Sequence, residues 1–586
     1  MTLIDTLSAI VGTAFEAAGF DHSYGAVKPA DRPDLAQFQC NGALASAKKA
    51  GENPRALAEK ICGGLTGHEA FQDVTIAGPG FINFKLSEDF VNDALGALAG
   101  DDKVGGWSTP AAEKIVIDYG GPNVAKPLHV GHLRTAIIGE SLKRIFRFAG
   151  HEVVGDIHLG DWGLQMGQLI SEMEIRQPEL IYFDEGVDGP YPDQPPIAIA
   201  DLEEMYPMAS AACKADEQRA DIARKATKAL QEGRPGYRAL WRHFVELSIA
   251  AMRVDYDDLG VEFDLWKGEA DADPYIPEIT QDLRERDILV ESDGAEIIRV
   301  DREGDKKEFP PIIFLNSKGA IGYHATDIAT IVDRQREINP DRMLYVVDAR
   351  QRLHFEQIFR AVGRAGYFDE TCLEHLWFGT MNGKDGKPFK TREGGTLKLR
   401  SFIDMLEEKA AARMVEGGVA DGLSADEAES VKKKVAIAAL KFADLSNPRV
   451  SDYSFDIDRF IAFEGKTGPY LLYAAVRVKS LLAKAETLGA KPSKAVASTA
   501  EEVDLALRLL SFADAVRDAC DKRSPHILCD HIYGLAQLFS KFYAACRILD
   551  EKDHEIRDSR LALAAITGRQ LETALSLLGL EPPERM

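Results

Sequence analysis

The stretch that decides the fold of this chain reads Pro122-Asn123-Val124-Ala125-Lys126-Pro127-Leu128-His129-Val130-Gly131-His132. It joins a strand-like run at 115–118 to a helix-like run at 133–148. The start of a helix leaves N–H groups unpaired and carries partial positive charge, so it attracts anions. His129 and His132 can face the same way, and Gly131 lets a flat ligand lie against the backbone. The stretch therefore predicts an anion site, with a nucleotide phosphate as the first candidate ligand.

The segments on either side of this stretch predict a parallel sheet. A strand at 115–118, a helix at 133–148 and a strand at 152–157 follow one another as a βαβ unit. Strand patterns return at 311–315, 343–347 and 376–378, after a polar and Pro-rich segment at about 170–310. We expect this segment to be an insertion between two halves of the sheet. Neither a G-x-G-x-x-G fingerprint nor a P-loop is found, so the dinucleotide-fold and P-loop interpretations lack support.

Two further domains are predicted around the sheet. Helix patterns and two strand-like pieces indicate a small N-terminal α/β domain at 1–108. After residue 425, apolar residues recur at spacings of three and four, which predicts a helical bundle with helices at 431–445, 471–485, 503–519, 531–549 and 559–577. The predicted fold class is multidomain α/β plus all-α. Its three domains are an N-terminal α/β domain (1–108), a parallel-sheet domain with an insertion (109–424) and a C-terminal bundle (425–586).

The composition favours an aqueous, reducing compartment. The chain has 586 residues, 45% of them hydrophobic, which suffices for several buried cores. Its seven cysteines include no CxxC pair, so neither a zinc site nor a disulfide framework is predicted. The N-terminus lacks the basic start of a signal peptide and no apolar run is long enough for a membrane span, so we expect a cytoplasmic protein. The net charge of −24 argues only weakly against nucleic acid, because screening makes charge act locally.

A basic loop at 383–395 follows a strand pattern and forms a second candidate element. It carries four cations between glycines: Lys384, Lys387, Lys390 and Arg392. Such a loop can close over a triphosphate and screen the charge that moves to a leaving pyrophosphate. Taken alone, a solvated basic loop is an equally good interpretation, just as two surface histidines near a helix cap are the alternative for His129 and His132.

Taken together, these motifs resemble those of one enzyme family. The tetrapeptide at 129–132 resembles the HIGH signature of class I aminoacyl-tRNA synthetases, and the basic loop is similar in place to their KMSKS loop. With Gly160-Asp161-Trp162-Gly163 and Gly78-Pro79-Gly80-Phe81-Ile82-Asn83-Phe84, nearly the whole chain resembles the arginyl-tRNA synthetases. The resemblance implies a Rossmann-like catalytic domain and an arginine–tRNA ligase. Such an enzyme makes arginyl-adenylate and pyrophosphate from L-arginine and ATP, then passes the arginyl group to the terminal adenosine of tRNA(Arg).

The resemblance also implies roles for residues on the ATP side. The catalytic residues would be Lys126, His129 and His132, and the ATP-binding residues would be His129, Gly131, His132, Lys387, Lys390 and Arg392. The second lysine of the KMSKS motif falls on Thr391, so we expect Lys126 to supply the missing cation. An exposed loop lysine is the alternative interpretation of Lys126. ATP would bring its own Mg²⁺, and no metal site on the protein is predicted.

An arginine pocket needs carboxylates in the plane of the guanidinium group. The resemblance implies a pocket formed by Asp118, Asn123, Tyr323, Asp327 and Gln351. If Tyr323 and Asp327 share a helical turn, their spacing lets an aromatic ring and a carboxylate hold one guanidinium group. Taken singly, these residue types more often cap strands, form turns, fill cores or cap helices.

The resemblance places tRNA contacts in both outer domains. The C-terminal bundle resembles the anticodon-binding domain of the family, where Tyr543 is the first candidate to stack on an unpaired base. A core tyrosine on an amphipathic helix is an equally good interpretation of Tyr543. The N-terminal domain resembles the family's additional tRNA-binding domain, and the family implies a monomer. Two other functions stay open: a class I synthetase for a different amino acid, and a catalytically silent tRNA-binding paralogue.

Overall fold

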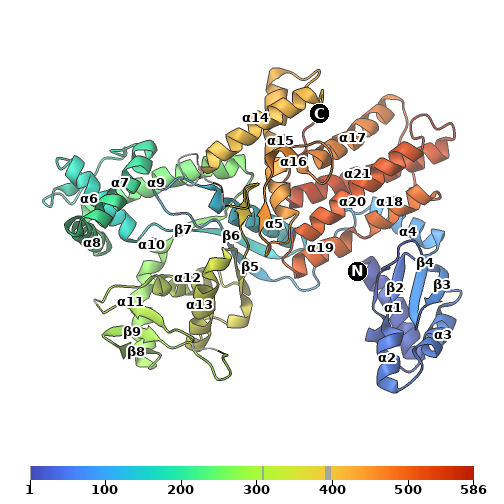
Figure 1. Cartoon of the computed structure of the whole chain (residues 1–586), viewed down its shortest axis with the longest axis horizontal. Helices are drawn as coiled ribbons and strands as arrows, with labels where there is room; N and C mark the ends of the chain where they lie inside the picture. Colours follow the sequence, from blue (N-terminus) through green and yellow to red (C-terminus); the bar gives the residue numbers. More distant parts are fainter. Residues whose placement is uncertain (1, 307–308, 318, 388, 390–396) are drawn as a thin grey trace.

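The computed structural model describes residues 2–306, 309–317, 319–387, 389 and 397–586. A parallel sheet lies at the centre of the molecule, with a helical bundle on one side and an inserted helical unit on the other (Figure 1). A small domain at the N-terminus packs beside the bundle (Figure 1). The predicted fold class, α/β domains joined to an all-α bundle, is therefore confirmed.

The N-terminal domain is an antiparallel sheet packed by helices. Its strands are arranged in the order β1-β2-β4-β3. The strands are β1 (Val27–Pro29), β2 (Phe38–Cys40), β3 (Phe71–Ala77) and β4 (Phe81–Leu86), and the helices are α1 (Leu3–Ala17), α2 (Gly42–Ala50), α3 (Pro54–Leu65) and α4 (Glu88–Ala99). The predicted turn at 78–80 is the hairpin between β3 and β4.

The N-terminal domain is attached to the C-terminal bundle. Arg517 Nη1 donates to Asp5 Oδ1 at 2.5 Å, and the Ala497 N–H donates to Asn92 Oδ1 at 2.8 Å. Both bonds join residues more than 400 positions apart. The two outer domains therefore form one continuous flank of the molecule (Figure 1).

The central sheet has five strands in the order β12-β11-β5-β6-β7, and every pairing is parallel. The strands are β5 (Lys114–Asp118), β6 (Glu152–Leu159), β7 (Leu265–Gly268), β11 (Arg342–Tyr345) and β12 (Leu373–His375). The strand expected at 376–378 is observed at 373–375 instead, and the strand expected at 311–315 does not join this sheet. Strand β7 was missed because four residues containing Trp266 and Lys267 carry no alternating or continuous apolar pattern.

The insertion has two parts. The first is helical: α6 (Leu164–Arg176), α7 (Ile199–Ala215), α8 (Glu217–Gln231) and α9 (Pro235–Asp258). The second has α10 (Glu269–Ala272), α11 (Ile276–Glu285) and a three-stranded antiparallel sheet of β8 (Leu289–Ser292), β9 (Ala295–Ile298) and β10 (Ile312–Leu315). Helices α12 (Tyr323–Glu337) and α13 (Arg352–Ala365) then return the chain to the central sheet.

Helices dominate the remainder of the chain. They are α14 (Leu399–Glu416), α15 (Ala425–Leu445), α16 (Ile457–Phe460), α17 (Gly468–Thr487), α18 (Ala500–Leu510), α19 (Phe512–Asp521), α20 (His526–Ala545) and α21 (His554–Leu577). A short parallel pair, β13 (Met381–Asn382) and β14 (Tyr453–Ser454), links this part to the sheet domain. The helix expected at 503–519 is divided at Ser511, whose side chain bonds to the Arg508 carbonyl. Among the described helices, none unites the length and the apolar content that crossing a bilayer requires.

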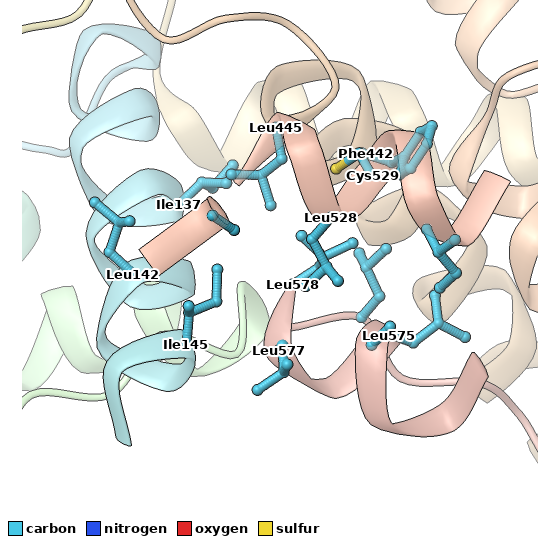
Figure 2. Packing of buried hydrophobic residues seen from close by; sticks show 14 of the residues in the cluster. Ile137, Leu142, Ile145, Phe442, Leu445, Leu528, Cys529, Leu575, Leu577 and Leu578 are labelled. Atoms are coloured by element: carbon cyan, nitrogen blue, oxygen red, sulfur yellow. The ribbon is translucent and has the colours of Figure 1, made fainter. Parts of the chain in front are cut away.

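Helix α5 (Leu133–Phe148), which follows the two histidines, is covered by the bundle. Figure 2 shows side chains of α5, α15, α20 and α21 meeting in one apolar layer. Ile137 and Ile145 of α5 are fully buried, as are Phe442 of α15 and Leu528 of α20. Each Å² of apolar surface that is buried stabilises this packing by roughly 25 cal/mol. The buried face therefore holds α5 in a fixed position beneath the candidate site.

A buried lysine closes the junction between α5, α9 and α21. Lys441 Nζ donates to the Leu259 carbonyl at 2.6 Å and to the Gly579 carbonyl at 2.7 Å. Arg144 adds bonds to the Gly260 and Ser576 carbonyls. Burial, reinforced by the nearby charge of Arg144, lowers the pKa of Lys441 to about 7.

The free energy of unfolding should rise with pH because of this lysine. Between about pH 7 and pH 10 the unfolded chain keeps a proton on Lys441 that the folded chain has lost, so higher pH favours the folded state. We expect the wild type to gain about 2 kcal/mol relative to Lys441→Met between about pH 7 and pH 9. Urea unfolding of both proteins at each pH measures the difference, and equal pH dependence would contradict the assignment.

Candidate active site

The two histidines meet at the start of α5 as the sequence predicted. The Gly131 N–H donates to His129 Nδ1 at 3.0 Å, and the His129 N–H donates to His132 Nδ1 at 3.2 Å. The rings stack with centroids 3.9 Å apart. A Cβ at residue 131 would stand 2.7 Å from His129 Cε1, so glycine is required here. Since both Nδ1 atoms accept hydrogen bonds, each ring carries its proton on Nε2.

Both imidazoles are neutral near pH 7. Burial, followed by the unfavourable interaction that a protonated His132 would have with His129 and Lys126, lowers the pKa of His132 to about 3. Burial and then Lys126 also lower the pKa of His129. The pair therefore offers hydrogen-bond donors without positive charge, and the cation of this segment is Lys126.

Lys126 borders a basic cavity. The cavity has a volume of about 540 Å³, lies between His129 and helix α7, and is also lined by Lys214 and Lys398. The Lys126 side chain is half-buried and makes no hydrogen bond or ion pair with the residues that the structure describes. Lys398 is paired with Glu203 at 2.9 Å. The chemistry of this cavity suits a phosphate group.

The described residues that follow the basic loop, 397–399, pair with the histidine segment. Lys398 forms an antiparallel bridge with His129, supported by bonds from Val130 N to Leu397 O at 3.1 Å and from Leu399 N to Leu128 O at 2.9 Å. The backbone thus fixes Lys398 beside His129, a proximity that spacing along the sequence does not reveal.

Only part of the predicted loop can be placed. Lys390, Thr391 and Arg392 lie outside the described residues. Lys387 is exposed in a turn where its N–H donates to Asp385 Oδ1. Lys384 is bound to Asp456 at 2.8 Å, so this cation of the loop is directed to the C-terminal part of the chain.

A second cavity, of about 330 Å³, opens on the other side of the histidines. His129, Gly131 and Arg134 line one side, and a segment that includes Phe378, Gly379, Thr380 and Met381 lines the other. An aromatic ring, backbone groups and a neighbouring imidazole are the features that hold a purine nucleoside. We call this space the nucleotide cavity.

Asp118 ends strand β5 and is already held by an arginine of the protein. Arg334 Nη2 donates to Asp118 Oδ2 at 2.6 Å, and Arg334 also binds Asp156 at 2.7 Å. All three residues are buried. The cluster thus contains two carboxyl groups and one guanidinium group in a buried position on β5 and β6. Asn123 lies nearby, bridged to Gly160, where a Cβ would stand 2.2 Å from Asn123 Oδ1.

Tyr323 and Asp327 occupy the first turns of α12, so they share a helix face. Tyr323 is 66% exposed, which rules out the core interpretation. His354 Nε2 lies 2.7 Å from Asp327 Oδ2, and its ring centroid lies 5.2 Å from that of Tyr323. Gln351 is exposed at the start of α13, one turn before His354. The structure thus brings Tyr323 and Asp327 together with His354 across α12 and α13, and it places Gln351 just before α13.

Two residues of this site were missed by sequence reasoning. His354 was passed over because an isolated histidine in a helix carries no signal. Glu269 follows strand β7, which was not predicted. Burial raises the pKa of Glu269. The charge of His158 lowers this pKa, and the charge of Asp327 raises it further. Glu269 therefore adds an acidic side chain directly after the carboxyl end of strand β7. If β7 had been recognised as a strand of the parallel sheet, Glu269 would have been predicted as a site residue, because ligands bind at the carboxyl ends of such strands.

Tyr543 lies on α20, far along the chain from the sheet. Its ring is half-buried, and the guanidinium carbon of Arg477 lies 4.3 Å from the ring centroid. The Phe539 ring stands 6.1 Å away on the same helix. One aromatic group and one cation thus lie together at the surface of the bundle, a combination that suits an unpaired base.

The chain matches three family models. The model for the catalytic domain of class I (R) tRNA synthetases covers residues 95–457, the DALR anticodon binding domain covers 471–586, and the arginyl tRNA synthetase N-terminal domain covers 2–86. Relatives named arginine–tRNA ligase from Maricaulis maris and Hyphomonas neptunium are 51% and 52% identical, with all of each chain covered.

Solved structures show the same architecture. An arginyl-tRNA synthetase from Plasmodium falciparum superposes with a TM-score of 0.83 at 25% identity, and one from Thermus thermophilus with 0.79 at 21% identity. Both alignments cover the full length of both chains. The chain belongs to the arginyl-tRNA synthetase family of class I synthetases.

Proposed function

We propose that this chain is an arginine–tRNA ligase that joins L-arginine to the 3′ end of tRNA(Arg) at the expense of ATP. The observation that supports the proposal is that two unlike groups of side chains follow the strands of one parallel sheet. Lys126 and two neutral imidazoles come after strand β5, whereas Asp118 ends β5, Glu269 follows β7 and Asp327 lies on α12. The first suits a triphosphate and the second suits a guanidinium group.

The reaction has two steps. In the first, a carboxylate oxygen of arginine attacks the α-phosphorus of ATP, a P–O bond forms, and the bond to the β-phosphate breaks to release pyrophosphate. In the second, a ribose hydroxyl of the terminal adenosine attacks the arginyl carbonyl, loses its proton, and AMP leaves. Lys126, His129 and His132 would donate to the phosphate oxygens, and Lys387, Lys390 and Arg392 would close over them. The magnesium ion arrives as part of the substrate MgATP.

The arginine pocket would combine charge and shape. Asp118 and Asp327 would bind the guanidinium group, Tyr323 would lie against its plane, and Asn123 and Gln351 would hydrogen-bond the polar head of the substrate. Tyr543 would stack on a base of the tRNA. We propose further that the enzyme acts as a monomer in the cytoplasm. Its seven unpaired cysteines are compatible with a reducing compartment.

Exchange of labelled pyrophosphate into ATP tests the proposed function. We expect arginine, among all the standard amino acids, to support exchange and to become attached to tRNA(Arg). Each assay is run with and without tRNA, so that a requirement for tRNA is not mistaken for inactivity. Exchange with another amino acid would indicate a different class I synthetase. Binding of tRNA without exchange under either condition would indicate a silent paralogue.

A further inference from the structure

A buried arginine joins the two sides of the nucleotide cavity. Arg134, two residues after His132, is only 2% exposed. Its Nη1 donates to the Gly379 carbonyl at 2.7 Å and to the Ser451 carbonyl at 3.3 Å. Its guanidinium carbon also lies 5.6 Å from the centre of the Phe378 ring. One side chain thus connects the histidine helix to the opposite side of the cavity.

The carboxylate that holds Arg134 comes from outside the sheet. Asp444, on α15, accepts from Arg134 Nε at 3.1 and 3.3 Å and from the Tyr453 hydroxyl at 3.3 Å. Asp444 is 1% exposed. Figure 2 shows its neighbours Phe442 and Leu445 in the apolar layer that α15 shares with α5. Packing on both sides therefore leaves the ion pair little freedom to rearrange.

The segment at 449–454 binds the side of the cavity that contains Gly379, which we call the Gly379 wall. The Gly379 N–H donates to the Arg449 carbonyl at 3.0 Å, and the Thr380 N–H donates to Asp452 Oδ1 at 2.6 Å. Met381 and Asn382 then pair with β14. This segment and Arg134 together fix the backbone at 379–382, and the position of Arg134 depends on Asp444.

We propose that Asp444 is a positioning residue for ATP, acting through Arg134 on the Gly379 wall of the nucleotide cavity. This inference rests on the proposed function. Asp444 touches no substrate. It keeps the Arg134 guanidinium in the one orientation that binds the Gly379 carbonyl, and that carbonyl sets the width of the cavity opposite His129. Loss of the Asp444 carboxylate should therefore weaken ATP binding and leave arginine binding unchanged.

The variant Asp444→Asn tests this inference through separate KM values for the two small substrates. We expect the KM for ATP to rise about tenfold and the KM for arginine to stay within about twofold of the wild type. Glu502→Gln is the matched control, because Glu502 is a buried carboxylate paired with Arg560 at 2.8 Å elsewhere in the bundle. It should change thermal stability without changing either KM.

Two further variants keep the test valid if Asp444→Asn does not fold. Tyr453→Phe removes only the hydroxyl bond to Asp444 and should raise the KM for ATP about threefold. Arg134→Lys keeps the charge but cannot bind Asp444 and the Gly379 carbonyl together, so it should raise the KM for ATP about tenfold. Combining Arg134→Lys with Asp444→Asn should add little to either change.

The outcomes separate this inference from the proposed function. A wild type without arginine-dependent exchange would defeat the proposed function and, with it, the inference that rests on it. With an active wild type, equal rises in the KM for ATP and for arginine would overturn the positioning role, because they indicate general distortion. An unchanged KM for ATP in folded Asp444→Asn, or in Tyr453→Phe where Asp444→Asn does not fold, would overturn it as well.

Discussion

Replacing Lys126 with alanine should lower the rate of arginyl-adenylate formation by about 100-fold and leave arginine binding close to that of the wild type. The expectation follows from the charge distribution at the start of α5. His129 and His132 are neutral, so they can donate hydrogen bonds but cannot balance the charge of a triphosphate. Lys126 borders the basic cavity and has no partner among the described residues, so its charge is available to the ligand.

Pyrophosphate exchange measures the first effect, and equilibrium dialysis with labelled arginine measures the second. Lys384→Ala is the matched control, because Lys384 is a loop cation that Asp456 holds at 2.8 Å. The control should exchange at nearly the wild-type rate. Near-normal exchange by Lys126→Ala would show that another cation, such as Lys398, supplies the charge missing at Thr391.

Replacing Asp327 with asparagine should reduce the preference for arginine over citrulline by about 100-fold. Citrulline has the shape of arginine without its positive charge, so the ratio of the two kcat/KM values reports the charge of the pocket. Asparagine can still accept the hydrogen bond from His354, which lies 2.7 Å from Asp327 Oδ2. The change therefore removes a charge and keeps the local geometry.

Asp305→Asn serves as the control for this second variant. Asp305 is a partly buried carboxylate bound to Arg360 at 2.7 Å beside the small antiparallel sheet, outside the proposed pocket. It should leave the preference for arginine unchanged. If Asp327→Asn also kept its preference, the guanidinium group would have to bind elsewhere, and Asp118 and Glu269 would be the next carboxylates to test.

Local spacing predicted one part of the site well. His129 and His132 face each other, and Tyr323 and Asp327 share a helix face, because their separations match the turn of a helix. These contacts arise within single elements, so periodicity along the chain suffices to find them.

The remaining residues come together only through tertiary pairing. Lys398 reaches His129 through a backbone bridge, Glu269 follows an unpredicted strand, and Arg334 binds Asp118 across 216 positions. No local pattern marks such contacts, since they depend on which strands are neighbours in the sheet. The roles of Lys390 and Arg392 stay predictions, because both lie outside the described residues.

The cover over α5 has a consequence for biosynthesis. Ser141 on α5 donates to the Leu577 carbonyl, 436 positions further along the chain. During translation, α5 therefore leaves the ribosome long before the residues that bury its apolar face are made. Until α21 arrives, Leu142 and Ile145 offer an exposed apolar stripe, a surface of the kind that chaperones bind and that promotes aggregation. The helix beneath the histidines is thus synthesised early and acquires its final packing late.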